Sequence, residues 1–207
     1  MKELGLLLAL LLGAVPMVRA GAQSDRELIG QLDREVIALR QKVARLEAKA
    51  GDCGGDGETG KIYPELVQVF SGSTVTVERK GSEVRVTLPA DVLFSGAGLT
   101  VREEANFALD LLATALKLHE VRALVVGHTD SDLPTGSAKK YFPTNWELSS
   151  ARASAVTRVL VDRYQVPPAR ITVGGRADTE PLSSNDTPEG RAINRRVVIH
   201  ILPGAKP

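Results

Sequence analysis

The feature that most constrains this 207-residue chain is a change of pattern at a glycine-rich segment. Residues 51–60 read GDCGGDGETG, with five glycines and no large apolar residue, which is typical of a flexible linker. Before it, residues 24–50 repeat apolar residues at helical spacing, whereas after it strand-like and helix-like runs alternate. The chain is therefore expected to contain a separate N-terminal helix and, over residues 61–207, one α/β (α+β) sandwich.

The first half of this sandwich is predicted to open with a hairpin. Residues 74–78 (TVTVE) and 83–88 (EVRVTL) alternate apolar and polar side chains and are joined by a short polar connection. Residues 67–70 are a candidate short strand before the hairpin. A helix is predicted over residues 101–118, with its buried side formed by Phe107, Leu111, Leu112, Ala115 and Leu116.

The next two elements are a strand and a long helix. Residues 121–127 (VRALVVG) form a near-continuous apolar run, as expected of a central strand that is covered on at least one face. A polar loop follows, and Thr144 and Glu147 then have the spacing of a capping box for a helix over residues 145–164.

Two further strands, over residues 171–174 and 197–202, complete the predicted sheet. Between them Thr187 and Pro188 have the order typical of a helix N-cap and first helical position. The hairpin must be antiparallel, whereas helical crossovers are expected to join the later strands in parallel. The sequence therefore predicts a mixed sheet.

Residues 1–20 have the pattern of a secretory signal peptide. Lys2 precedes an apolar run over residues 4–18, and Val18-Arg19-Ala20 offers small residues on either side of Arg19 for cleavage. The run is shorter than the roughly 20 residues that a helix needs to span a bilayer. An uncleaved inner-membrane anchor is the alternative, because Arg19 lies inside the cleavage motif. Both interpretations predict that the rest of the chain is exported.

Residues 21–50 are assigned to a coiled coil. Over residues 24–50, β-branched residues at heptad position a and leucine at position d favour a parallel two-stranded coiled coil. Position a holds Ile29, Val36 and Val43, and position d holds Leu32, Leu39 and Leu46. We therefore expect a homodimer through residues 24–50, with a trimer, or a helix packed on its own domain, as the alternatives.

Composition narrows the range of partners and cofactors. The chain has 26 basic and 25 acidic residues, so it has no overall field to hold a nucleic acid. Its single cysteine, Cys53, excludes an intramolecular disulfide and is expected to be a free thiol or to bridge two copies. Three histidines and one cysteine supply a zinc site poorly, and neither a metal nor a cofactor is predicted.

Four motifs in fixed order carry more specific information: GHTD at residues 127–130, NWELSSARA at 145–153, RI at 170–171 followed by GG at 174–175, and NDTPEGRAINRRV at 185–197. Over residues 88–202 this series closely resembles the OmpA-like domain, which is shared with the C-terminal part of the flagellar stator protein MotB. The resemblance implies a βαβαβ-type module that binds the peptide stem of peptidoglycan, at its diaminopimelate residue.

The resemblance also implies site residues. The aspartate of GHTD and the arginine of LSSARA, here Asp130 and Arg152, correspond to the main ligand contacts. Chemistry supports this pair, because a stem-peptide diaminopimelate presents an ammonium and a carboxylate on one carbon, which one fixed anion and one arginine fork can hold. An internal Asp130–Arg152 salt bridge is the alternative. Further candidate contacts are Thr129, Asn145, Leu148 and Arg195, with Arg196 as an alternative to Arg195.

Other functions fit the sequence less well. A motor stator needs an acidic residue in a membrane helix, and residues 4–18 contain none. His128, Asp130 and Ser149 or Ser150 are the residue types of a hydrolase catalytic triad, but no G-x-S-x-G elbow surrounds either serine. A porin would need more strands than the chain has room for before the module. We therefore expect a non-enzymatic protein of the cell envelope that lies in the periplasm and is associated with peptidoglycan. Association with the outer membrane is a further expectation, whose mode the sequence leaves open.

Overall fold

The computed structural model describes residues 57–95 and 98–204. The predicted signal peptide, the coiled coil and Cys53 lie outside these residues. The helices are α3 (Glu58–Val69), α4 (Ala90–Leu93), α5 (Glu103–Leu118), α6 (Gly136–Tyr141), α7 (Asn145–Arg158) and α8 (Pro188–Asn194). A π-helical turn (Val159–Arg163) extends α7, and a 3-10 turn (Pro168–Arg170) precedes β4. The strands are β1 (Thr76–Lys80), β2 (Glu83–Pro89), β3 (Val121–His128), β4 (Ile171–Gly175) and β5 (Arg196–Pro203).

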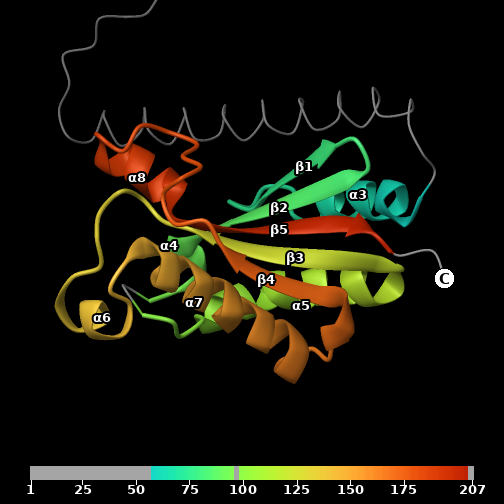
Figure 1. The fold of residues 1–207 in the computed structure, drawn as a ribbon. Helices are drawn as coiled ribbons and strands as arrows, with labels where there is room; N and C mark the ends of the chain where they lie inside the picture. Colours follow the sequence, from blue (N-terminus) through green and yellow to red (C-terminus); the bar gives the residue numbers. More distant parts are fainter. Residues whose placement is uncertain (1–56, 96–97, 205–207) are drawn as a thin grey trace, which may run out of the picture. The chain divides into compact units, whose positions relative to one another are not determined.

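The five strands form one mixed sheet in the order β1-β2-β5-β3-β4 (Figure 1). The predicted hairpin is confirmed, since β1 and β2 pair antiparallel with Lys80 opposite Glu83. Strands β3 and β4 are parallel, as expected of strands joined by a helical crossover through α7.

The expectation that the last strand also runs parallel to its neighbours is wrong. Strand β5 lies between β2 and β3 and is antiparallel to both, with Arg196 opposite His128. The short helix α8 does not carry the chain back along the sheet. Strand β5 therefore starts at the edge where β3 and β4 end.

One hydrophobic core joins the sheet to α3, α5 and α7. Fully buried side chains of the strands, such as Val86, Val125 and Ile199, contact buried residues of the helices. Helix α7 lies alongside β4 and β3 (Figure 1). No helix within the described residues has the length and apolar character needed to cross a membrane.

The predicted buried side of α5 is only partly correct. Leu112, Ala115 and Leu116 are buried, but Leu111 is half-buried and Phe107 is 74% exposed. The helix has apolar residues around most of its circumference, so its periodicity does not select one face. The face that meets the core consists of Ala105, Leu109, Leu112, Ala113 and Leu116.

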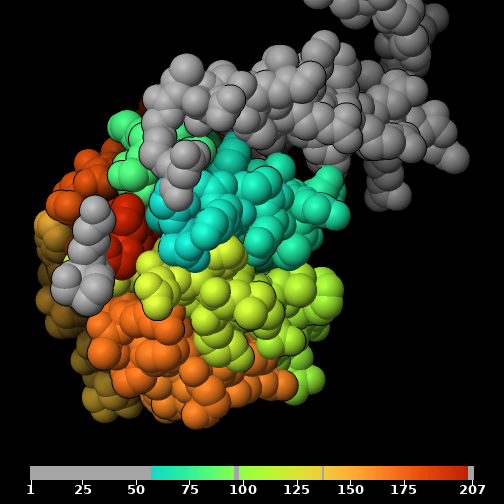
Figure 2. All heavy atoms as spheres, turned by 90° about the vertical axis from the view of Figure 1, so that its right-hand side faces the viewer, coloured from blue at the N-terminus to red at the C-terminus, as the bar shows by residue number. Residues whose placement is uncertain are grey.

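Residues 67–70, a candidate strand, belong instead to the end of α3 and its cap. Helix α3 also begins inside the predicted linker, at Glu58, and buries Thr59. Both ring nitrogens of His119 lie 3.0 Å from α3 carboxylates, Nδ1 from Glu58 and Nε2 from Glu65. In Figure 2 the blue-green residues of α3 lie against the yellow-green residues that follow α5. His119, which is distant in sequence, thus holds the first turns of α3. This contact explains why the helix extends into the glycine-rich segment.

Candidate functional site

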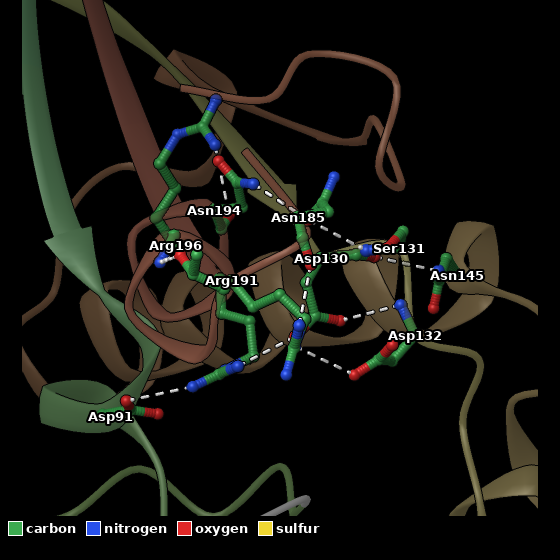
Figure 3. Close-up of polar contacts among 12 residues, drawn as sticks. Asp91, Asp130, Ser131, Asp132, Asn145, Asn185, Arg191, Asn194 and Arg196 are labelled. Carbon is green, nitrogen blue, oxygen red and sulfur yellow. Dashed lines mark hydrogen bonds and ion pairs between the residues drawn. The ribbon is translucent and has the colours of Figure 1, made fainter. Parts of the chain in front are cut away.

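The residues of the predicted site lie around the end of β3. Asp130 follows the strand and is only 7% exposed, and its backbone carbonyl accepts a hydrogen bond from Nδ2 of Asn145 at 3.1 Å (Figure 3). The Thr129 N–H donates to the carbonyl of Ala177 at 2.8 Å. The end of β3 is thus fixed to the first residue of α7 on one side and to the loop after β4 on the other.

Asp130 forms an ion pair with an arginine, Arg195, that lies 65 positions later in the chain. Nη1 of Arg195 lies 2.8 Å from Oδ2 of Asp130, and Nη2 of the same arginine lies 3.4 Å from Asp91 on α4. The hydrogen bond to Asp130 is the main cause that raises the pKa of Arg195. A second pair, between Asp132 and Arg191 at 3.3 Å, ties the loop to α8 (Figure 3).

Arg152 lies on α7 and is 6% exposed, with its guanidinium 5.7 Å from the centre of the Phe94 ring. Burial, and then the neighbouring charge of Arg195, lower its pKa, whereas Asp130 and Asp91 act in the opposite direction. Within the described residues no ion pair joins Arg152 to Asp130, whose partner is Arg195. The alternative of an internal Asp130–Arg152 salt bridge therefore does not match the structure.

Helix α7 reaches this position because it packs very closely on β3. A Cβ atom at Gly127 would overlap the backbone carbonyl of Ser149, so only glycine permits this approach. The predicted capping box at the start of the helix is confirmed: Thr144 accepts from the Trp146 N–H at 3.2 Å, and Glu147 accepts from the Thr144 N–H at 2.8 Å. The start of α7 is therefore fixed in two ways.

The two serines considered for a hydrolase make local hydrogen bonds. The Ser149 hydroxyl donates to the carbonyl of Trp146 at 3.1 Å and accepts from the Ala177 N–H at 3.1 Å. The Ser150 hydroxyl donates to the same carbonyl at 2.8 Å. The Ser149 hydroxyl thus ties α7 to the loop after β4, whereas the Ser150 hydroxyl bonds within the helix.

Several buried polar atoms around the end of β3 have no hydrogen-bond partner among the described residues. They are Nδ1 of His128, Oγ1 of Thr129, Oδ1 of Asn145, Nε of Arg152 and Nε of Arg196. Buried polar groups are nearly always paired, so such a concentration in one part of a protein indicates a place where further polar atoms bind. Three of these five residues were selected as site residues from the sequence.

His128 and Arg196 are neighbours across β3 and β5. Burial, followed by the charges of Arg196, His200 and Arg176, lowers the pKa of His128 to about 3, so its imidazole is neutral at physiological pH. The Arg196 guanidinium donates to the carbonyls of Asn194 and Glu180, at 3.1 and 2.9 Å. Arg195, rather than Arg196, is therefore the arginine that contacts Asp130.

The structure brings the predicted site residues to one place. Thr129 and Asp130 follow β3, Arg195 follows α8, and the remaining three lie on the inward side of α7: Asn145, Leu148 and Arg152. Sequence reasoning missed Asp91 and Phe94, which approach from α4 and belong to none of the four motifs. No cluster of three or more histidine, cysteine, aspartate or glutamate side chains suited to a metal ion occurs within the described part of the chain.

Comparison with known proteins shows the family to which this fold belongs. A model of the OmpA family matches residues 93–195. A probable lipoprotein of Escherichia coli, YiaD, is 34% identical over 140 residues, which cover 67% of this chain and 60% of the lipoprotein. The chain therefore spans less than two thirds of that relative's length.

Two solved structures have the same fold. One is the cell wall anchor of the type VI secretion system (T6SS) of Pseudomonas aeruginosa, with a TM-score of 0.61 and 36% identity, covering 68% of this chain and 99% of the anchor. The other is the periplasmic domain of Helicobacter pylori MotB, with a TM-score of 0.57 and 27% identity, covering 65% of this chain and 85% of that domain. The resemblance found in the motifs is thus confirmed over the module.

Proposed function

The chain belongs to the OmpA family, and from that premise we propose that its C-terminal module binds peptidoglycan non-covalently through the diaminopimelate of a stem peptide. The observation that carries the proposal is the set of partnerless buried polar atoms beside Asp130 and Arg152. The solved relative that acts as a cell wall anchor supports it.

In this proposal the site recognises both charges on one carbon of the ligand. Asp130 accepts from the ammonium, and Arg152 binds the carboxylate with a fork that is already desolvated and held on the Phe94 ring. Thr129 and Asn145 offer Oγ1 and Oδ1 for further hydrogen bonds. Leu148 forms an apolar wall between Asn145 and Arg152, and Arg195 completes the charge pattern. The role is binding, with no chemical step.

We further propose the arrangement of the whole protein. A signal peptide exports the chain, residues 24–50 pair two copies, and the glycine-rich segment lets each module reach the wall from the periplasm, near the outer membrane. Two linked modules would bind a polymeric wall with higher apparent affinity than one, because the second contact forms within one molecule. On its own, the protein would be tethered to the cell wall. If the coiled coil also bound another protein, the chain would act as a scaffold at the wall.

The test is co-sedimentation of the full chain with purified sacculi. We expect Asp130→Asn and Arg152→Gln to reduce the bound fraction at least tenfold, since each removes one of the two charges that meet the ligand. Arg158→Ala is the matched control for Arg152, because it lies on the same helix and is 82% exposed. Circular dichroism would verify that each variant is folded. Wild-type retention by both folded site variants would reject the site.

Sacculi of two compositions test the ligand itself. In walls whose stem peptide contains lysine, the second carboxylate is absent, so Arg152 loses its ligand partner and binding should fall strongly. Equal binding to both walls would contradict the recognition of diaminopimelate. Release of soluble muropeptides during incubation would instead indicate hydrolysis, the alternative that we regard as the weaker one.

A further inference from the structure

Helix α5 carries a stripe on its solvent side in which three apolar residues, Phe107, Leu111 and Leu118, are aligned with the small side chain of Thr114. Phe107 and Leu118 are 74% and 73% exposed, the highest values among the large hydrophobic side chains of the described residues. Leu111 is half-buried and Thr114 is exposed. Single exposed apolar residues are common, but an aligned row on one helix is typical of a contact surface.

The spacing of this α5 stripe is that of a helix–helix seam. Its members are four, three and four residues apart, so they follow the a and d positions of a heptad. The stripe lies opposite the core-facing side of the helix, which includes Leu109, Leu112 and Leu116. Helix α5 therefore has two apolar sides, one for its own core and one that faces away from the module.

We infer that the α5 stripe packs against the same stripe of a second copy of this chain, with the two helices antiparallel. A two-fold axis through the middle of the stripe would place Phe107 against the partner's Leu118, and Leu111 against the partner's Thr114. Each large exposed side chain then finds a large apolar neighbour. A self-complementary patch of this kind is what a two-fold dimer requires.

The charges beside the stripe favour this occupant and this direction. Asp110 and Lys117 are seven residues apart, two turns of the helix, so they lie on the same flank. Both are exposed, and neither forms an ion pair within the described part of the chain. In the antiparallel arrangement Asp110 lies close to the partner's Lys117, twice by symmetry. A parallel arrangement would place the two copies of Asp110 on opposite sides of the seam, so neither would meet the partner's Lys117.

The contact is small. A helix of 16 residues is about 24 Å long, and one pair of such helices buries less than the roughly 1,000 Å² expected of a stable interface. It therefore depends on a high local concentration of modules. The proposed pairing through residues 24–50 would supply this, since a short flexible linker gives an effective concentration of about 1 mM or more. The inference does not depend on what the module binds.

The test uses cysteines placed in the full chain with Cys53→Ser as background. Under copper-phenanthroline oxidation, the Phe107→Cys/Leu118→Cys double variant should form a disulfide dimer, with residue 107 joined to residue 118 of the other copy by mass spectrometry. Each single variant should give at least fivefold less dimer, because two 107 positions would be about 16 Å apart along the helix axis. An intramolecular 107–118 bridge is excluded by the same distance.

Charge exchange provides the matched test on the same cysteine background. Asp110→Lys should lower the dimer yield at least fivefold, and adding Lys117→Asp should restore it to within twofold. Cross-links joining 107 to 107 would overturn the antiparallel arrangement. Equal yields from single- and double-cysteine variants would overturn the contact between copies.

Discussion

Nη1 of Arg195 lies 2.8 Å from Oδ2 of Asp130, so the carboxylate proposed to hold a ligand's ammonium already has a cationic partner. Asp91 shares that arginine, at 3.4 Å from Nη2. An arriving ammonium must compete with Arg195 for Asp130. By attracting the same guanidinium, Asp91 makes this exchange easier.

This relationship gives a prediction for Asp91→Asn. Without the second carboxylate, Arg195 binds Asp130 alone and opposes the ligand more strongly. Because the Asp91 side chain is 67% exposed, its pair with Arg195 contributes about 0.2–1 kcal/mol, so the affinity for diaminopimelate-containing sacculi should fall by about 1.4- to 5-fold. Sedimentation over a range of sacculus concentrations measures this change.

Two further variants serve as the rescue and the control for Asp91→Asn. Asp91→Glu should restore affinity, and Asp162→Asn, a 70% exposed acid on the π-helical turn after α7, should leave it unchanged. An increase in affinity for Asp91→Asn would contradict the prediction. It would indicate that Asp91 acts mainly by repelling the ligand's carboxylate.

The close approach of α7 to β3 predicts a strong effect of Gly127→Ala. The added methyl group would overlap the carbonyl of Ser149, and neither backbone can move without disturbing the other. We expect a loss of roughly 2–3 kcal/mol in the free energy of unfolding, measured with urea. Gly174→Ala on the neighbouring strand is the matched control, because its Cβ would meet nothing within 4 Å. Similar losses in both variants would show that the contact with Ser149 is not the cause.

The sequence could predict those features of the fold that depend on residues close together in the chain. The hairpin, the Thr144 capping box and the Thr187 N-cap each depend on residues within a few positions, and all three are confirmed. Helix α3 was missed because its first turn is fixed by His119, which is 61 positions away from Glu58. The exposure of Phe107 was missed because α5 offers apolar residues to more than one side.

The candidate site also contains some residues that local motifs predict and others that only the folded structure reveals. Asp130 and Arg152 lie in motifs, whereas Asp91 meets Arg195 across 104 positions of the chain and carries no local signal. The choice between Arg195 and Arg196 was open because the two residues are adjacent. The structure separates them, since Arg196 is the first residue of β5 and lies opposite His128, whereas Arg195 caps α8 and contacts Asp130.

The contact of His119 with two carboxylates predicts a loss of stability as pH rises above about 6.5. Burial lowers the pKa of His119, but the hydrogen bonds with Glu65 and Glu58 outweigh it, so the net pKa is raised. Two cationic groups lie nearby: Lys61 pairs with Glu58, and the Arg170 guanidinium donates to the backbone carbonyl of His119 at 2.8 Å. The folded state thus holds the proton more tightly, and the stabilisation is complete below about pH 6.5 and is lost as pH rises through the folded pKa.

Urea unfolding at pH 6 and pH 9 would measure this effect. His119→Gln should remove much of the difference between the two pH values, whereas Glu120→Gln, the exposed neighbour, should not. Unchanged pH dependence in His119→Gln would contradict the assignment. Protease cleavage near residue 58 should rise in parallel, since α3 is the element that His119 holds.

His128 predicts a loss of stability on the acid side. Burial and three neighbouring cationic groups lower its pKa to about 3, so the unfolded chain binds a proton at this residue below about pH 6.5 and the folded chain does not. The protein therefore loses stability as pH falls from 6.5 toward 3, by roughly 2–3 kcal/mol at pH 4.5, since each pH unit is worth about 1.4 kcal/mol. His128→Gln cannot bind this proton, so its stability relative to wild type should rise by that amount between pH 7 and pH 4.5, measured with urea. Carboxylates titrate in both proteins and cancel in this difference. A difference that does not change with pH would show that His128 is protonated in the folded protein, which would require a nearby anion that the described residues do not supply.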